Sequence, residues 1–178
     1  PTRAAFVQKK DGKFDACWTY ATSSGQHYAY QTPADNSYSK SPLDVPSATF
    51  PEKASEFEAQ TAIGGGPGLI NKGKIVDTWK EELFEVGGVE PASSQPRTAV
   101  GVTSDKKMIM FVCEGRNMTE GVKGMTTAEV AEILKDLGCV EAINLDGGGS
   151  TCMLVNGKET IKVSDGAQRA VASAVYFK

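Results

Sequence analysis

The feature that most constrains this chain is a run of glycines at the end of a short apolar segment. Residues 142–151 read AINLDGGGST, with a polar Asn144 inside the apolar segment and Asp146 directly before three glycines. Glycine is entropically costly to order, and a simple chain reversal rarely needs three of them, so the run indicates a close approach of the backbone to another group. We predict a strand that presents Asp146 at its end, followed by a turn whose amides face a ligand.

Length, charge and hydropathy exclude several classes of protein. The 178 residues are enough for one domain with its own core. The net charge of −3 and the lack of a basic cluster argue against nucleic acid as a partner. The longest apolar run, residues 108–113, is too short to cross a bilayer, so we predict no membrane-spanning segment.

The cysteines and the single histidine argue against a metal site. Cys17, Cys113, Cys139 and Cys152 are widely spaced and form no CxxC pair, and His27 is the only histidine. Because the carboxylates are also scattered, we assign no metal-binding residues and no cofactor, and the metal requirement stays open. Cys113 and Cys152 lie in apolar runs and are interpreted as small buried hydrophobic residues. His27 lies in an alternating segment and is interpreted as a packing or surface residue, and a disulfide that involves Cys139 stays open.

Alternating apolar patterns and turn residues predict strands along much of the chain. Residues 4–7 and 14–20, joined by Asp11-Gly12, are typical of a β-hairpin, and residues 26–31 predict a third strand. Residues 32–55 are rich in proline and short polar residues and predict a long surface loop, either beside a functional site or as an insertion.

Two further strands are predicted in the second half of the chain. Residues 98–103 and 108–113 both have strand character, and the second is apolar on both faces, which predicts a central position in a sheet. Residues 151–155 and 159–163 predict a hairpin around Asn156-Gly157.

One helix is predicted over residues 125–138. Thr126 and Glu129 form a capping-box pattern at its start, and Gly138 is the residue type that commonly ends a helix. The apolar stripe consists of Val130, Ile133, Leu134 and Leu137. Residues 170–177 predict a closing strand. Because strands dominate and there is one long helix, we predict an α+β fold: a single domain with a mixed, largely antiparallel sheet and one main helix packed on it.

Polar clusters follow several of the predicted strands and supply the chemistry of anion binding. Arg97, Arg116 and Arg169 can hold a phosphate in a bidentate grip, and Arg116 is the one that best fits a plain surface charge. The two glycine runs, residues 64–66 and 147–149, can present backbone amides to an anion.

Several stretches of the chain resemble the phosphodiester glycosidase family. They extend over residues 62–175 and are AIGGGPGLINKGKIV, PRTAVGVT, EGR, GMTTAEVAEILKDL, AINLDGGGSTCMLV followed by NG, and RAVASAV. The resemblance implies hydrolysis of a sugar 1-phosphodiester, such as N-acetylglucosamine-1-phosphodiester, to free sugar and a phosphomonoester.

The residues present suit that reaction. A phosphomonoester is a good leaving group, so the site needs donors that stabilise an anionic phosphate more than it needs a strong acid. We predict Asp146 as the carboxylate at the sugar C1 atom, with Asn144 and Glu114 orienting the sugar or a water. The predicted substrate-binding residues are Arg97, Arg169, Gly65, Gly66, Gly147, Gly148, Gly149, Ser150 and Thr151.

One departure from the family pattern opens alternatives. The family usually carries an Asn-Gly-Gly-Phe-Phe-like element upstream of its first central strands, and the sequence contains none. We therefore expect residues 1–178 to be a phosphodiester glycosidase-like domain without the N-terminal part of the full domain. The alternatives are a non-catalytic glycan- or phosphate-binding domain of a cell-surface protein and a structural domain of a cell-surface or phage-like assembly. Analogy with exported bacterial relatives predicts a secreted, periplasmic or cell-surface location, and the sugar, the aglycone, the stereochemistry and the oligomeric state stay open.

Overall fold

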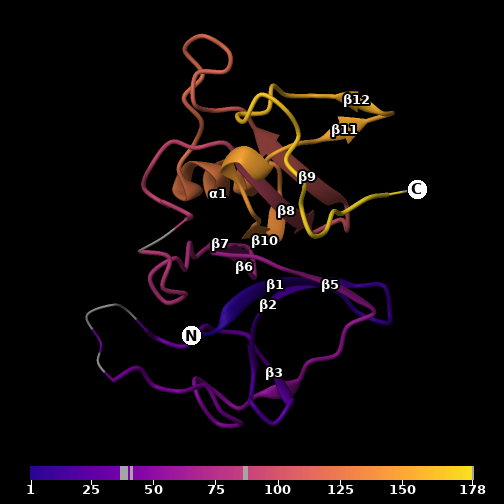
Figure 1. Cartoon of the computed structure of the whole chain (residues 1–178). Helices are drawn as coiled ribbons and strands as arrows, with labels where there is room; N and C mark the ends of the chain where they lie inside the picture. The colour runs from indigo at the N-terminus through magenta and orange to yellow at the C-terminus, as the bar shows by residue number, and fades with distance from the viewer. Residues whose placement is uncertain (37–39, 41, 86–87, 178) are drawn as a thin grey trace.

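Strands β1 to β10 form two antiparallel sheets, one helix packs on the second of them, and β11 and β12 form a separate hairpin (Figure 1). The computed structural model describes residues 1–36, 40, 42–85 and 88–177. The N-terminal sheet has the order β4-β3-β2-β1-β5, with β1 Arg3–Gln8, β2 Phe14–Ala21, β3 His27–Tyr30, β4 Ser55–Glu56 and β5 Thr61–Gly64. The central sheet has the order β7-β6-β10-β8-β9, with β6 Gly68–Asn71, β7 Lys74–Ile75, β8 Arg97–Thr103, β9 Met108–Cys113 and β10 Cys139–Asn144.

The predicted α+β class with one main helix is confirmed, and the strands divide between the two sheets. The layers follow the order helix, central sheet, N-terminal sheet (Figure 1). Alternation along β1 sends Ala4 and Phe6 toward the central sheet, while Ala5 and Val7 face the outer side. The core between the sheets consists of Ala4, Phe6, Ala16, Trp18, Val100, Val102 and Ile143.

The predicted helix is confirmed as α1, Thr127–Asp136. The Thr126 side chain accepts from the Glu129 amide, and the Glu129 carboxylate accepts from the Thr126 amide, which completes the capping box. Val130 and Leu134 are fully buried against the central sheet. Leu137 is the C-cap and is 51% exposed, so the buried stripe ends one turn earlier than predicted.

The predicted hairpin of β1 and β2 and the strands β3, β8 and β9 are confirmed, but the central position of β9 is wrong. β9 pairs only with β8 within the described chain and lies at the edge of its sheet. Ile109 and Phe111 pack toward the α1 cluster, whereas Met110 is 39% exposed. An apolar pattern on both faces shows the type of residue but not whether a second strand lies alongside, so it predicted a central position for β9 wrongly.

The C-terminal segment forms less sheet than predicted. Asn156 and Gly157 make the predicted turn, but the strands beside it are only β11 Leu154–Val155 and β12 Lys158–Glu159. Residues 170–177 are exposed and contain no strand, so the predicted closing strand is wrong. Strand-forming residues make a strand only where a sheet edge accepts their backbone hydrogen bonds, and within the described chain residues 170–177 pair with no strand.

The predicted loop of residues 32–55 contains no strand before β4 in its described parts, and residues 37–39 and 41 lie outside them. Tyr30 donates its hydroxyl to the Ser47 carbonyl at 2.8 Å and so attaches the loop to β3. Among the described residues, no helix has the length and apolar character needed to cross a bilayer.

Glu141 on β10 makes a prediction about stability and pH. Its side chain is 9% exposed, and burial raises the pKa of its carboxyl from 4.5 to about 7. The folded state therefore holds this proton more tightly than the unfolded chain, and the resulting stability is lost as pH rises from 4.5 through 7. We expect Glu141→Gln to remove ~3 kcal/mol of that pH dependence, measured by denaturant unfolding at pH 5 and pH 8. The prediction is contradicted if the free energy of unfolding changes by the same amount between pH 5 and pH 8 in wild type and variant.

Candidate active site

The end of β10 is bonded to the glycine loop between β5 and β6. The Asn144 side-chain amide donates to the Gly66 carbonyl at 2.9 Å and to the Leu145 carbonyl at 2.8 Å. The Gly66 amide donates in return to the Asn144 carbonyl at 2.7 Å. Asn144 is 2% exposed, and its Oδ1 has no hydrogen-bond partner in the described part of the chain. The geometry makes Asn144 the link between the two glycine-rich segments.

Asp146 lies at the rim, just beyond this link. The Leu145 amide donates to the Thr98 carbonyl at 2.8 Å, and the Gly148 amide donates to the Pro96 carbonyl at 2.9 Å, so both flanks of Asp146 are bonded to the start of β8. Asp146 itself is exposed, and no hydrogen bond or ion pair is found for it among residues that the structure describes. Its carboxylate is therefore held on a fixed backbone and is open to solvent.

Two arginines from separate segments lie over the glycines that follow Asp146. Arg116 and Arg169 both contact Asp165, at 3.8 Å from Arg116 NH1 and 3.0 Å from Arg169 Nε. A Cβ on Gly148 would lie 3.0 Å from Arg116 NH2, and one on Gly149 would collide with Arg169 and Asp165. Both guanidinium groups therefore lie close to the backbone of this loop, where glycine leaves room for them.

The predicted glycine cradle is only partly available. The Gly65 and Gly66 amides donate to the Ala4 and Asn144 carbonyls, and the Gly148 amide donates to Pro96. The amides of Gly147 and Gly149 have no such partner within the described chain, and Gly149 is buried close to the Asp165 and Arg169 side chains. Ser150 Oγ accepts from Arg169 NH1 at 3.4 Å.

Thr151 faces the interior. It is 1% exposed, and its hydroxyl accepts from the Thr98 hydroxyl at 3.3 Å. Its predicted contact with substrate does not fit this position, since the side chain supports the start of β8 instead.

Arg97 does not lie with the other two arginines. It is 2% exposed, and burial lowers the pKa of its guanidinium. Four of its five N–H groups donate to backbone carbonyls at 2.7–2.8 Å, those of Val89, Glu90, Ser93 and Met125. Arg97 thus binds four backbone carbonyls of the surrounding loops, whereas Arg116 and Arg169 lie at the glycine loop. The phosphate contact of Arg97 stays a prediction.

Glu114 holds the C-terminal segment. Its Oε1 accepts from the Lys162 amide at 2.7 Å. The Thr119 hydroxyl, and after it the Lys162 amide, lower the pKa of the Glu114 carboxyl. This position fits an ionised anchor that keeps residues 162–169 near the rim, rather than a group free to orient a sugar.

Glu82 is a buried carboxylate that the sequence interpretation missed. It is 0% exposed and accepts from the Ala4 and Gly68 amides, both at 2.8 Å. It lies in a short turn segment with no periodic pattern, so only the unusual sequence WKEELF marks it, and either of its two acids could have been the buried one.

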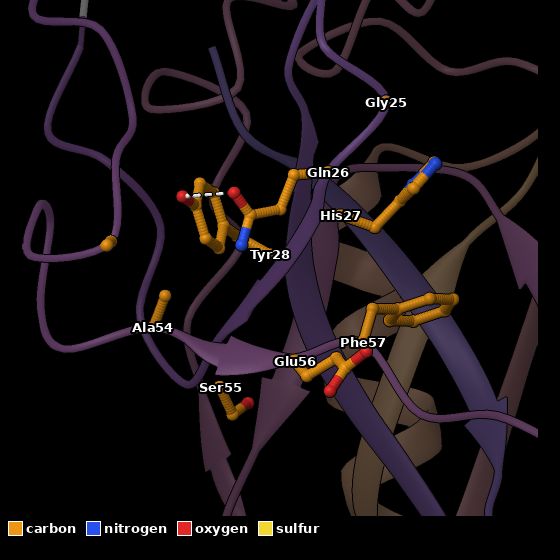
Figure 2. Close-up of a pocket in the computed structure, with 9 residues that line it drawn as sticks. Gly25, Gln26, His27, Tyr28, Ala54, Ser55, Glu56 and Phe57 are labelled. Carbon is orange, nitrogen blue, oxygen red and sulfur yellow. Dashed lines mark hydrogen bonds between the residues drawn. The ribbon is translucent and has the colours of Figure 1, made fainter.

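The largest cavity described lies away from this rim, beside β3 and β4. It has a volume of about 710 Å³ and includes Gln26, His27, Tyr28, Glu56 and Phe57 in its lining. Figure 2 shows the His27 and Phe57 rings on one side of the β3–β4 ribbon and the Gln26 and Tyr28 side chains on the other. Tyr28 donates its hydroxyl to Gln26 Oε1 at 3.0 Å. Because the polar groups do not converge, this cavity is not the candidate active site.

No group of three or more His, Cys, Asp or Glu side chains suited to a metal ion is found among the described residues. All four cysteines are free thiols, so the disulfide left open for Cys139 is not formed, and the predicted burial of Cys113 and Cys152 is partial.

The loop that begins with the exposed Asp146 thus carries two guanidinium groups over its glycines, and such groups commonly bind anions. The family model for phosphodiester glycosidases matches residues 4–178, and the chain belongs to this family.

Relatives and solved structures agree with this assignment. The chain is similar to the mouse N-acetylglucosamine-1-phosphodiester alpha-N-acetylglucosaminidase, with 42% identity over 108 residues, 60% of this chain and 20% of the mouse protein. It is 35% identical over 80 residues, 45% of this chain and 12% of the relative, to an uncharacterized prophage-derived protein of Bacillus subtilis. The catalytic domain of the zebrafish N-acetylglucosamine-1-phosphodiester alpha-N-acetylglucosaminidase, solved auto-inhibited by its pro-peptide, superimposes with a TM-score of 0.57 at 25% identity. That match covers 92% of this chain but only 45% of the zebrafish chain, so the chain spans less than half of the solved domain.

Proposed function

We propose that this chain binds a sugar 1-phosphodiester at the rim after β10 and supplies the carboxylate that hydrolyses it. The observation that carries the proposal is the position of Arg116 and Arg169 over Gly148 and Gly149, in the loop that begins with Asp146. Two cations from separate segments converge there on the backbone of one short loop. Family membership supports the same substrate class.

The chemistry divides between the two halves of this site. Arg116, Arg169 and the amides of Gly147 and Gly149 hold the phosphate and stabilise its charge as the bond between the sugar C1 and the phosphate oxygen breaks. Asp146 acts at C1 as base or nucleophile. Asp165 keeps the two guanidinium groups oriented when no substrate is bound.

One observation favours a second candidate function. The chain covers 45% of the zebrafish catalytic domain, so groups supplied by the remainder of that domain are not among these residues. A domain that binds the phosphosugar without hydrolysing it is consistent with the same arginine pair.

The test is incubation of the chain with the methyl phosphodiester of α-N-acetylglucosamine 1-phosphate, with free N-acetylglucosamine and methyl phosphate as the measured products. Release of both supports hydrolysis. Saturable binding in calorimetry without release selects the second candidate, and the absence of both release and binding contradicts the proposed site.

The arginine pair makes a separate prediction about affinity. Removing either cation with Arg116→Ala or Arg169→Ala deletes charge-assisted bonds to the phosphate, so we expect the Kd for the phosphodiester to rise roughly 10- to 100-fold. Lys158→Ala, at the exposed first residue of β12, removes the same charge without touching the arginine pair and should leave the Kd unchanged. Equal Kd values for all three variants would exclude the pair from the phosphate site.

A further inference from the structure

Glu82 is a fully buried carboxylate that the proposed chemistry does not use. Its two oxygens accept four hydrogen bonds, from the Ala4 amide at 2.8 Å, Trp18 Nε1 at 3.0 Å, the Gly68 amide at 2.8 Å and Thr78 Oγ1 at 2.7 Å. Within the described chain no salt bridge accompanies them. Burial raises the pKa of Glu82, and the four donors oppose that rise. A buried carboxylate is costly unless its lone pairs are satisfied, so this site is built around the donors.

Three of the four donors come from the two sheets, and Thr78 lies in the turn segment of Glu82 itself. Ala4 lies on β1 and Trp18 on β2 of the N-terminal sheet, while Gly68 begins β6 of the central sheet. The Trp18 ring also lies against Gly68, where a Cβ would come within 2.7 Å of Trp18 Cζ2. Glu82 thus joins the sheets at the point where the glycine loop enters β6.

The glycine loop connects this carboxylate to the rim. A Cβ on Gly66 would lie 2.5 Å from the Phe84 ring and 2.6 Å from Glu82 Oε2, so the loop backbone passes close to both side chains. On its other side Gly66 exchanges two hydrogen bonds with Asn144, at 2.9 and 2.7 Å. The Asn144 side-chain amide also donates to the carbonyl of Leu145, the residue before Asp146. A continuous set of contacts therefore runs from Glu82 through Gly66 and Asn144 to the residue before the exposed acid.

We propose that Glu82 is a positioning residue, which fixes the glycine loop against Asn144 and so sets the direction in which the end of β10 presents Asp146. The inference rests on the proposed function only in taking Asp146 as the reacting carboxylate. A purely cohesive role would need no particular chemistry at this position, because well-packed apolar residues can replace buried charges without loss of stability. A carboxylate, in contrast, fixes the donor positions, since each of its bonds is directional.

The test measures the loop directly, by amide hydrogen exchange in nuclear magnetic resonance. Glu82→Gln keeps the shape of the side chain but turns an acceptor into an NH₂ donor that faces existing donors. We expect exchange of the backbone amides of Gly66 and Asn144 to accelerate about tenfold or more, while backbone amides of α1 such as that of Leu134 keep their protection. The matched control is Glu141→Gln, a second buried carboxylate on β10, which should leave the Gly66 and Asn144 amides unchanged.

Unchanged exchange at Gly66 and Asn144 in Glu82→Gln would overturn the proposal, and so would equal acceleration throughout α1, since that reports a general loss of stability. If Glu82→Gln does not fold, Thr78→Val takes its place, because it removes one donor to Glu82 with little change in volume. The same local acceleration of exchange is expected, and its absence overturns the proposal.

Where hydrolysis is measurable, Glu82→Gln should lower kcat while KM changes less than roughly threefold, since the phosphate ligands are untouched. The exchange result does not depend on turnover, so failure of the proposed function and failure of this inference are distinguishable.

Discussion

Asp146→Asn is expected to reduce hydrolysis of a sugar 1-phosphodiester roughly 10²- to 10⁴-fold, with the fold unchanged. The substitution preserves the size of the side chain but removes the negative charge and the basicity at the exposed end of β10. The backbone on both sides stays bonded to Thr98 and Pro96, so the loop keeps its shape. The measurement is kcat from the rate of free sugar release, with circular dichroism to confirm the fold.

The matched control for this substitution is Asp136→Asn at the end of α1, which makes the same change in charge at an exposed position away from the rim. Its kcat should equal that of wild type. Equal turnover of Asp146→Asn and wild type would remove Asp146 from the mechanism, whatever else binds at the rim.

The second large effect concerns stability. Arg97→Met removes the donors to four partly buried backbone carbonyls, and we expect a loss of about 4 kcal/mol in the free energy of unfolding. For a chain of this size the loss corresponds to a fall in Tm of roughly 10 °C. Arg97→Lys keeps the charge but has fewer donors in a different geometry, so it should recover part of the loss and no more.

Arg116→Ala is the comparison for this prediction. Arg116 is exposed, so its removal should change the free energy of unfolding by less than about 0.5 kcal/mol while weakening binding of the phosphodiester. The opposite pattern, normal stability with weak binding for Arg97→Met, would return Arg97 to the phosphate site.

The elements that were predicted correctly depend on local sequence. The α1 helix follows from its capping box and its apolar stripe, and the β1–β2 hairpin follows from alternation around Asp11-Gly12. The strand that ends at Asn144 follows from a short apolar run before glycines, which is typical of a buried strand that leads into a turn. In each case the determining contacts lie within a few residues of one another in the chain.

What the sequence did not reveal depends on distant partners. Arg97 and Arg116 both follow or begin strands, and only the fold shows that one meets four carbonyls while the other meets Asp165. No local sequence pattern marks Glu82 as buried, because three of its four donors come from distant segments and only one comes from the neighbouring turn. The edge position of β9 and the unpaired residues 170–177 likewise depend on which strands are present to pair with them.

The central claim is that a phosphosugar is held between Asp146 and the pair Arg116 and Arg169. The most direct measurement is a titration of the Asp146→Asn variant with the methyl phosphodiester of α-N-acetylglucosamine 1-phosphate, followed by nuclear magnetic resonance. The account predicts that the largest shifts occur at the Gly147 and Gly149 amides and at the Nε–H groups of the two arginines. Shifts confined to the cavity beside β3 and β4, or no shifts at millimolar probe, would contradict it.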